Sequence, residues 1–202
     1  MSKGVSVWLL LCGFLLMRFC IFPTSTMSDS IRVHFVCLGN ICRSPLAEGV
    51  FREKVEAHEL DDAFDISSSG TGDWHVGNKA DRRMRKTAKR HGLSIESHRA
   101  SQFRKTDLAD HDHIFVMDKS NLNDVLFLDE DNTYSGKVRL FREFDPEPGN
   151  YQVPDPYSGG REGFERVYSI VDRTAEVLLT RLIDEYDLAS DASSDETKTE
   201  AA

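Results

Sequence analysis

The chain has few cysteines and no excess of basic residues, and its longest apolar run suits a signal peptide better than a membrane span. Its four cysteines, at positions 12, 20, 37 and 42, form no Cys-x-x-Cys pair and no Cys/His cluster with zinc-ligand spacing. Free thiols of this kind fit a reduced compartment best. The formal net charge of −9 argues against nonspecific nucleic-acid binding, which requires a basic surface. A zinc domain and a nucleic-acid partner are therefore disfavoured.

Residues 1–30 form an apolar N-terminal extension. Its segment Val5–Met17 has a length that suits the apolar part of a signal peptide better than a membrane span. Three interpretations stay open: export, membrane anchoring, or translation that begins at Met27 and makes the preceding residues an artefact of the gene model. Export fits the chemistry poorly, because Cys37 and Cys42 would be exposed to oxidation outside the cytosol. We therefore expect a cytoplasmic protein with no stable membrane span.

The rest of the chain predicts one folded domain and a short tail. A chain of 202 residues with 40% hydrophobic residues is long enough for an ordinary globular domain with extensions. We place this domain at residues 31–186. Residues 187–202 consist mainly of Asp, Ser, Glu, Thr and Ala, and such a segment cannot bury enough apolar surface to become ordered. We therefore expect an acidic, disordered tail.

Strand and helix patterns alternate through the domain. Apolar segments predict strands over residues 31–36, 64–68, 114–117 and 138–141. Apolar residues at helical spacing predict a helix that begins at Pro45 and further helices near residues 80–88, 122–126 and 164–182. This alternation indicates an α/β fold: a single doubly wound domain with a parallel sheet flanked by helices. In such sheets the ligand lies at the carboxyl ends of the strands.

The stretch Cys37–Ser44 joins the first predicted strand to the first predicted helix. Ser44 is a good N-cap residue, and Pro45 suits the first position of a helix. A tight loop in this place points successive backbone N–H groups and the positive end of the helix dipole into one small concavity. The stretch is therefore predicted to be a phosphate-binding loop.

Two side chains give this loop the means for chemistry. The N–H groups and the helix dipole favour the thiolate form of Cys37 at the base of the loop. The planar fork of Arg43 can hold two equatorial oxygens of a phosphate that the thiolate attacks. Asn40 tolerates a left-handed conformation, and the Ser44 hydroxyl can donate to the thiolate and help it leave. A Cys and an Arg at this spacing are common by chance, so the strand and the helix start around them carry the prediction.

The segment Val36–Pro45 resembles the signature loop of the low-molecular-weight protein tyrosine phosphatases. The match covers about Ile31 to Tyr186 and continues in the family's order and spacing through Ser69-Gly70-Thr71, Trp74-His75-Val76-Gly77, Met117-Asp118-Lys119-Ser120-Asn121 and Val153-Pro154-Asp155-Pro156-Tyr157. The resemblance implies a four-stranded parallel sheet and hydrolysis of phosphotyrosine through a phosphocysteine intermediate. It also implies a metal-independent reaction without a cofactor, in which the loop and Arg43 supply the positive charge.

The resemblance assigns a role to Asp155. An aryl phosphate needs its leaving oxygen protonated, and a carboxylic acid normally does this. Asp155 matches the family's general acid, which then acts as the base for the water that hydrolyses the phosphocysteine. From the residues alone, the Asp-Pro pair is ordinary turn chemistry, although Pro154 and Pro156 stiffen the loop around the carboxyl group.

Further roles follow from the resemblance alone. The loop residues that would surround the phosphate are Leu38, Gly39, Asn40, Ile41, Cys42 and Ser44. Trp74 and Tyr157 would flank the substrate ring. Asp118 and Asn121 would help to hold the loop, although Asp118 could equally be a helix N-cap. Cys42 matches a partner cysteine that forms a reversible disulfide with the nucleophile, with a small packing residue as the alternative.

Several other activities are alternatives to a tyrosine phosphatase. Phosphoarginine phosphatases of the family typically carry a small polar residue where Ile41 stands, so phosphotyrosine is favoured. A related arsenate reductase needs a cysteine downstream of Cys42, and this chain has none. A phosphocarrier subunit of similar topology lacks the loop Arg and the Asp-Pro acid, which are present here as Arg43 and Asp155. A non-catalytic phosphotyrosine-binding module would have lost Cys37 or Asp155, and both are retained. The expected partner is a tyrosine-phosphorylated protein, with a bacterial tyrosine autokinase as one candidate. Ser158 replaces a second tyrosine that many eukaryotic members carry, and the oligomeric state stays open.

Overall fold

The computed structural model describes residues 30–188, so the predictions for residues 1–29 and 189–202 lie outside the described range. Four parallel strands form one sheet in the order β2-β1-β3-β4. Their bounds are β1 Ile31–Cys37, β2 Phe64–Gly70, β3 His113–Val116 and β4 Val138–Leu140. The predicted α/β architecture with a four-stranded parallel sheet is confirmed.

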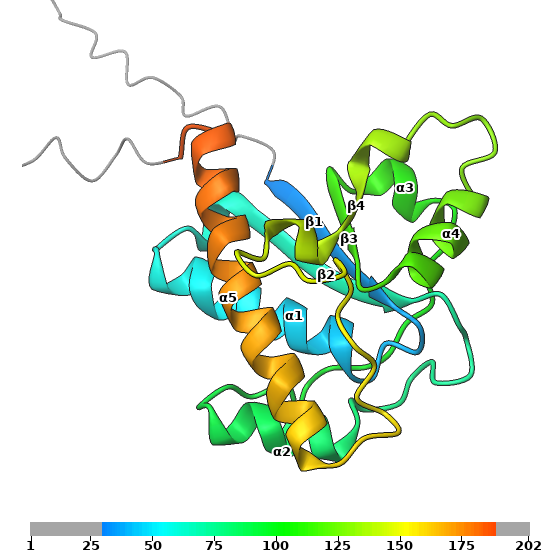
Figure 1. The fold of residues 1–202 in the computed structure, drawn as a ribbon. Coiled ribbons are helices and arrows are strands. Elements are labelled where there is room, and N and C mark those ends of the chain that lie inside the picture. The colour runs from blue at the N-terminus through cyan, green and yellow to red at the C-terminus, as the bar shows by residue number, and fades with distance from the viewer. Residues whose placement is uncertain (1–29, 189–202) are drawn as a thin grey trace, which may run out of the picture.

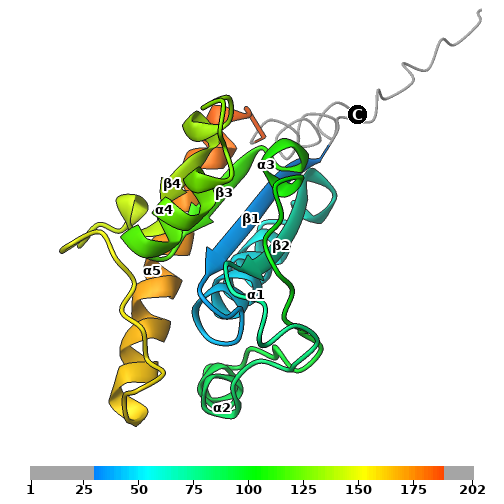
Figure 2. The same ribbon diagram turned by 90° about the vertical axis from the view of Figure 1, so that its right-hand side faces the viewer.

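The helices cover both faces of this sheet. The α-helices are α1 Arg43–Ala57, α2 Arg82–Arg90, α3 Asp107–Asp110, α4 Lys119–Phe127 and α5 Arg161–Glu185. Three short 3₁₀ helices are η1 Asp61–Ala63, η2 Ser135–Lys137 and η3 Phe141–Phe144. Helices α1 and α5 pack on one face of the sheet, and α3 and α4 lie against the other (Figure 1, Figure 2). The fold is therefore doubly wound.

The chain order places a site at the end of β1. From β1 the chain passes to β2 on one side and then returns to β3 on the other, so the neighbours of β1 diverge at its carboxyl end. Open α/β sheets bind ligands at such switch points. Cys37 ends β1 and pairs in register with Gly70, the last residue of β2.

Aromatic packing holds α1 against β1. The ring of Phe35, in the middle of β1, lies with its centroid 5.6 Å from that of Phe51 on α1 and 5.5 Å from that of Phe141. All three side chains are fully buried. Fully buried aromatic side chains dominate the packing energy of a core. Their contacts therefore fix the positions of β1 and α1, the two elements that flank the loop.

Several element ends differ from the predictions. Helix α1 begins at Arg43, with Cys42 in the N-cap position, instead of at Pro45 with Ser44 as its cap. The Ser44 hydroxyl is directed to Cys37 and to a backbone carbonyl, and Pro45 fits the first turn because N–H groups there have no acceptor within the helix. Strand β4 ends one residue early because Phe141 begins η3.

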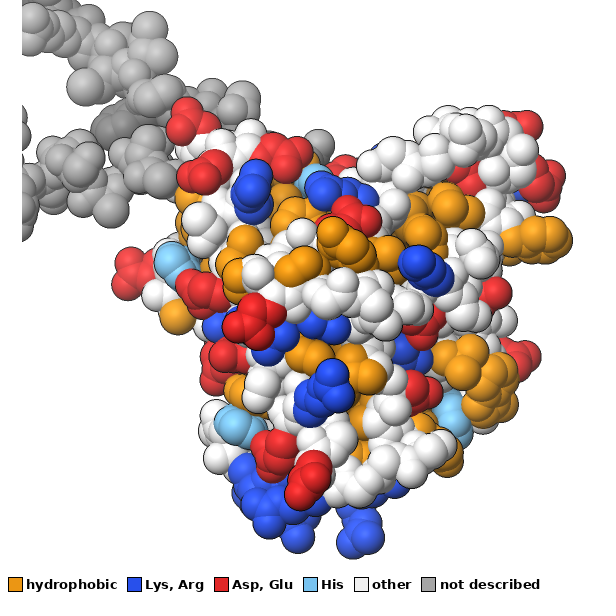
Figure 3. Space-filling model, in the orientation of Figure 1, with side chains coloured by type: hydrophobic (Ala, Val, Ile, Leu, Met, Phe, Trp, Pro, Cys, Tyr) orange, Lys and Arg blue, Asp and Glu red, His pale blue; other side chains and the backbone are white. Residues whose placement is uncertain are grey.

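Helix α2 confirms the helix predicted near residues 80–88, and it ends two residues before Gly92. Asp81 caps its N-terminus through a 2.7 Å bond from the Arg83 N–H, and Gly92 follows its end with φ +89°. Lys and Arg side chains gather over this helix at the lower end of the molecule (Figure 3). Among the described residues, no helix combines the length and the apolar character needed to cross a membrane.

Candidate active site

The loop between β1 and α1 is held in place by Asn40. This residue has φ +51°, which confirms the left-handed conformation expected for it. Its buried amide nitrogen donates to the hydroxyls of Ser44 (2.8 Å) and Ser68 (2.9 Å), and its amide oxygen accepts from the Ser101 N–H (2.8 Å). These three side-chain bonds tie the loop to α1, to β2 and to the segment that precedes α3.

Cys37 lies at the floor of this loop. Its side chain is buried, and the Ser44 hydroxyl donates to its Sγ at 3.1 Å. The same hydroxyl also lies 3.2 Å from the Ser69 carbonyl oxygen, within donating distance. A hydroxyl donor at the sulfur stabilises negative charge on it, as predicted from the sequence.

Arg43 connects the loop with two other segments. Its buried guanidinium donates to the Asp118 carboxylate at 2.5 Å and to the Val153 carbonyl oxygen at 3.2 Å, and it lies 3.7 Å from the Asp155 carboxylate. Burial works to lower the pKa of Arg43, but the charges of Cys37 and Asp118 raise it above its ordinary value. The guanidinium therefore stays positively charged at the base of the site.

Asp118 contacts both Arg43 and the N-terminus of α4. One carboxylate oxygen accepts from Arg43, and the other caps α4 by accepting from the Asn121 N–H at 2.8 Å. The Asn121 side chain is buried, and its Oδ1 has no hydrogen-bond partner among the described residues. The contact between α4 and the loop thus runs through Asp118.

A cavity of about 380 Å³ opens above Cys37. Its lining brings together residues from three segments: Cys37, Leu38, Gly39, Ile41, Cys42, Arg43, Trp74, His75, Asp155 and Tyr157. Asp155 is half exposed at the rim, and the rings of Trp74 and Tyr157 are largely exposed on its walls. Arg83 donates to the Tyr157 carbonyl at 2.9 Å, which fixes that wall to α2. Every predicted catalytic residue and both predicted flanking residues line this one pocket.

Cys42 differs from Cys37 in its surroundings. Both are free, buried thiols. Burial raises the pKa of the Cys42 thiol, and the nearby charges of Asp81, Cys37 and Asp155 raise it further. Cys42 is therefore a protonated thiol at neutral pH.

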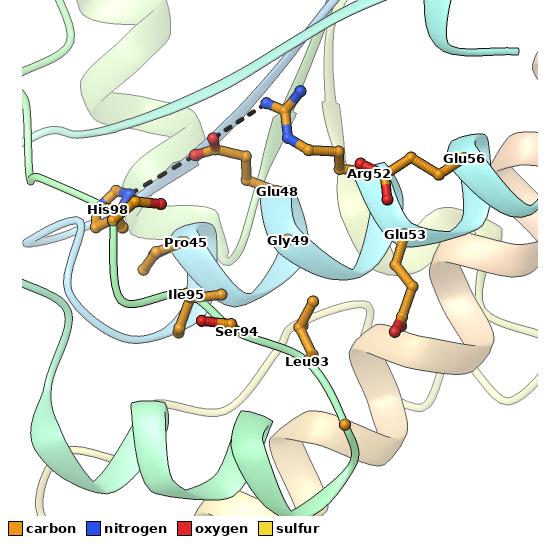
Figure 4. Close-up of a pocket in the computed structure, with 12 residues that line it drawn as sticks. Pro45, Glu48, Gly49, Arg52, Glu53, Glu56, Leu93, Ser94, Ile95 and His98 are labelled. Atoms are coloured by element: carbon orange, nitrogen blue, oxygen red, sulfur yellow. Dashed lines mark hydrogen bonds and ion pairs between the residues drawn. The ribbon is translucent and has the colours of Figure 1, made fainter.

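Sequence reasoning missed a group of residues on the side of the loop away from the pocket. The ring of His98 lies 2.9 Å from the Asn40 carbonyl oxygen and 3.7 Å from the Glu48 carboxylate, which accepts from the Ser68 hydroxyl at 2.7 Å. Burial opposes ionisation of Glu48, but the contacts with His98 and Ser68 lower its pKa. Figure 4 shows Glu48 between His98 and Arg52, at a cavity of about 340 Å³ beside α1. These residues are far apart in the sequence, so no local pattern could have found them.

His75 was also missed as a pocket residue, although the tetrapeptide that contains it was part of the resemblance. No group of three or more His, Cys, Asp or Glu side chains within residues 30–188 is arranged to hold a metal ion.

Comparison with known proteins assigns the chain to a family. The family model described as low molecular weight phosphotyrosine protein phosphatase matches residues 32–188. The phosphatase of that name from Schizosaccharomyces pombe is 44% identical over 143 residues, which are 70% of this chain and 90% of the relative. The human phosphatase is 39% identical over 150 residues, 74% of this chain and 94% of the relative.

Solved structures agree with this assignment. A crystal structure of a protein tyrosine phosphatase from Entamoeba histolytica, with Hepes in its active site, superposes with a TM-score of 0.73 at 37% identity and covers 78% of this chain and 99% of that one. YfkJ from Bacillus subtilis superposes with a TM-score of 0.74 at 32% identity, over 78% of this chain and 98% of that one. The chain belongs to the low molecular weight phosphotyrosine protein phosphatase family.

Proposed function

We propose that this protein is a protein-tyrosine-phosphatase that works through a phosphocysteine intermediate, with Cys37 as nucleophile, Arg43 as phosphate clamp and Asp155 as general acid and then base. The observation that carries the proposal is that the Cys37 sulfur, the Arg43 guanidinium and the Asp155 carboxyl line one pocket at the carboxyl end of β1. Membership of the family, whose relatives are named tyrosine phosphatases, supports the same activity.

In the first step the Cys37 thiolate attacks phosphorus, and the bond from phosphorus to the tyrosyl oxygen breaks. The leaving oxygen takes a proton from Asp155, whose carboxyl group lies at the rim where the phenol would stand. Arg43 and the N–H groups at the start of α1 hold the equatorial oxygens of the transferred group. The products are a phosphocysteine and the dephosphorylated tyrosine side chain of the substrate protein.

In the second step water attacks the phosphocysteine, and the bond from sulfur to phosphorus breaks. The Asp155 carboxylate accepts a proton from this water. The Ser44 hydroxyl, 3.1 Å from Sγ, stabilises the departing thiolate. Inorganic phosphate leaves, and Cys37 and Asp155 return to their starting protonation states.

The shape of the pocket supports phosphotyrosine as the substrate. Cys37 is buried at its floor, so a short phosphoserine side chain would not reach the sulfur. Trp74 and Tyr157 supply aromatic walls for a phenyl ring, and Ile41 adds an apolar side chain where the phosphoarginine phosphatases carry a small polar one. The half-exposed carboxyl of Asp155 at the rim supports catalysis over binding alone, because a module that only binds phosphotyrosine does not require a general acid.

A reducing, cytoplasmic location is part of the proposal. Two buried free thiols in one loop, Cys37 and Cys42, support it, because the nucleophile must stay reduced to react. The partner is a tyrosine-phosphorylated protein, for which a bacterial tyrosine autokinase is one candidate.

The test compares phosphate release from phosphotyrosine, phosphoserine and phosphoarginine peptides by the reduced full chain in excess chelator. We expect turnover of phosphotyrosine alone. Cys37→Ser abolishes it, and Asp155→Ala lowers kcat by about 10²–10⁴-fold, as loss of a general acid does. Asp110→Ala removes an exposed carboxyl outside the pocket and serves as the matched control. Binding of phosphotyrosine without turnover would leave a recognition module in place of the enzyme.

A further inference from the structure

A second hollow lies beside the catalytic pocket and shares two of its walls. This cavity of about 420 Å³ is bordered by Leu38 and Trp74, which also line the catalytic pocket. Its other apolar lining comes from Phe103, Phe127 and Leu128. We call this hollow the Phe127 groove.

Three of the exposed side chains around the Phe127 groove are large and apolar, beside the polar Gln102 and Asp124. Leu38 is 40% exposed, Trp74 60% and Phe127 83%, and all three border the same hollow. Single exposed apolar residues are ordinary, but apolar side chains grouped around a hollow mark an interaction site. An exposed Phe127 side chain at the end of α4 adds no hydrophobic stabilisation to the folded protein.

The wall between the two pockets is fixed. A Cβ atom on Gly72 would lie 2.1 Å from the indole of Trp74, so this ring packs directly on the backbone of Gly72. The Thr71 hydroxyl donates to the Asp124 carboxylate on α4 at 3.2 Å and ties the same loop to the opposite side of the groove. Trp74 is therefore held with the catalytic pocket on one side and the Phe127 groove on the other.

We propose that the Phe127 groove binds an apolar side chain of the protein substrate, close in sequence to its phosphotyrosine. This inference rests on the proposed function, which puts the phosphotyrosine ring in the neighbouring pocket. The polypeptide that carries the ring must leave that pocket over its rim, where Leu38 and Trp74 lead directly into the groove. The Asp124 carboxylate in the groove wall disfavours an acidic side chain in the same place. The groove thus selects among phosphotyrosine proteins by one neighbouring residue.

The experiment uses the full chain and a set of phosphotyrosine peptides in which one Leu or one Asp is moved through the three positions on each side of the phosphotyrosine. We expect Leu at one position to raise kcat/KM on the order of tenfold over Asp, the discrimination that an apolar pocket provides. Phe127→Ala removes this preference, whereas Phe127→Leu retains most of it. Turnover of a small aryl phosphate, which does not reach the groove, changes less than twofold in both variants.

Val76→Ala is the matched control, because it shortens an exposed apolar side chain that lines neither pocket. Equal kcat/KM for all peptides, or an equal loss on peptides and aryl phosphate in Phe127→Ala, overturns the proposal. The proposal is also overturned if the chain forms a dimer that Phe127→Ala disrupts while the peptide preference stays unchanged, since a second copy of the chain would then occupy the groove. If the chain turns over no phosphotyrosine at all, the proposed function fails. Calorimetric binding of the same peptides to Cys37→Ser then still tests the groove.

Discussion

Ser44 shows how one hydroxyl can serve both the fold and the reaction. It sits in the first turn of α1, accepts from the Asn40 amide at 2.8 Å and donates to the Cys37 sulfur at 3.1 Å. The Ser44 side chain is fully buried, so solvent does not supply a hydrogen bond to the Cys37 sulfur when the hydroxyl is removed. A hydrogen bond to a charged group contributes about 1.5–3 kcal/mol, more than a bond between neutral groups.

We predict that Ser44→Ala lowers kcat by about 10–100-fold, the range that corresponds to the loss of one hydrogen bond to a charged atom. The thiolate becomes a poorer leaving group, so the second step slows more than the first. Rapid acid quenching followed by mass spectrometry of the Cys37 peptide is therefore expected to find more phosphocysteine than in the wild type. Equal kcat and no accumulation would show that the hydroxyl is only structural. Ser67→Ala, outside the loop, is the control.

The end of strand β2 sets the shape of the phosphate loop. Gly70 pairs with Cys37, and a Cβ on Gly70 would lie 2.8 Å from the Leu38 carbonyl oxygen and 2.9 Å from the Asn40 nitrogen. These atoms belong to the loop backbone, which cannot move aside without changing the N–H groups that we propose to bind the phosphate. The close approach of two strand ends thus requires glycine here.

We predict that Gly70→Ala lowers kcat/KM for an aryl phosphate by about 10–100-fold, because small displacements of catalytic groups are costly. Overpacking also destabilises the fold by about 1–3 kcal/mol, measured by urea unfolding. Gly136→Ala, where a Cβ meets no atom within 4 Å, is the matched control and retains both properties. Wild-type activity in Gly70→Ala would mean that the loop adapts freely.

At the scale of the whole molecule, a buried histidine joins the sheet to the segment before β3. His34 on β1 lies 2.7 Å from the hydroxyls of both Ser67 and Ser69, and its ring centroid is 4.3 Å from that of His111. Burial, together with the nearby charge of His111, lowers the pKa of His34 from 6.5 to about 3. The folded state therefore keeps this ring neutral well below neutral pH.

The pKa shift of His34 predicts a loss of stability in acid. Above pH 6.5 the ring is neutral in both states, and between pH 6.5 and about 3 only the unfolded chain binds the proton. Between pH 7 and pH 5 this group removes about 2 kcal/mol from the free energy of unfolding. Urea unfolding of the wild type and of His34→Gln at both pH values measures it, since Gln keeps hydrogen-bonding groups but does not titrate. Equal losses in the two proteins would contradict the prediction.

The sequence alone predicted the loop that carries the proposed nucleophile and phosphate clamp. The strand, the loop and the helix around Cys37 and Arg43 are contiguous in the chain, so apolar periodicity and turn residues were enough to find them. The alternation of elements was sufficient for the doubly wound class. Asp155 needed the resemblance to a family, because an Asp between prolines is locally only a turn.

Only the tertiary structure decided how distant segments meet. The pairing of Arg43 with Asp118, the support of Asn40 by Ser68 and His98, and the closeness of Gly70 to the loop join residues that are 28 to 75 positions apart. The start of α1 at Arg43 depends instead on a contact within the loop, because the Ser44 hydroxyl donates to the Cys37 sulfur and does not cap the helix. Phe127 reads in the sequence as one more apolar residue at a helix end. Its position beside Trp74 follows from the packing of α4 on β3 and β4, and such contacts leave no periodic signal in the chain.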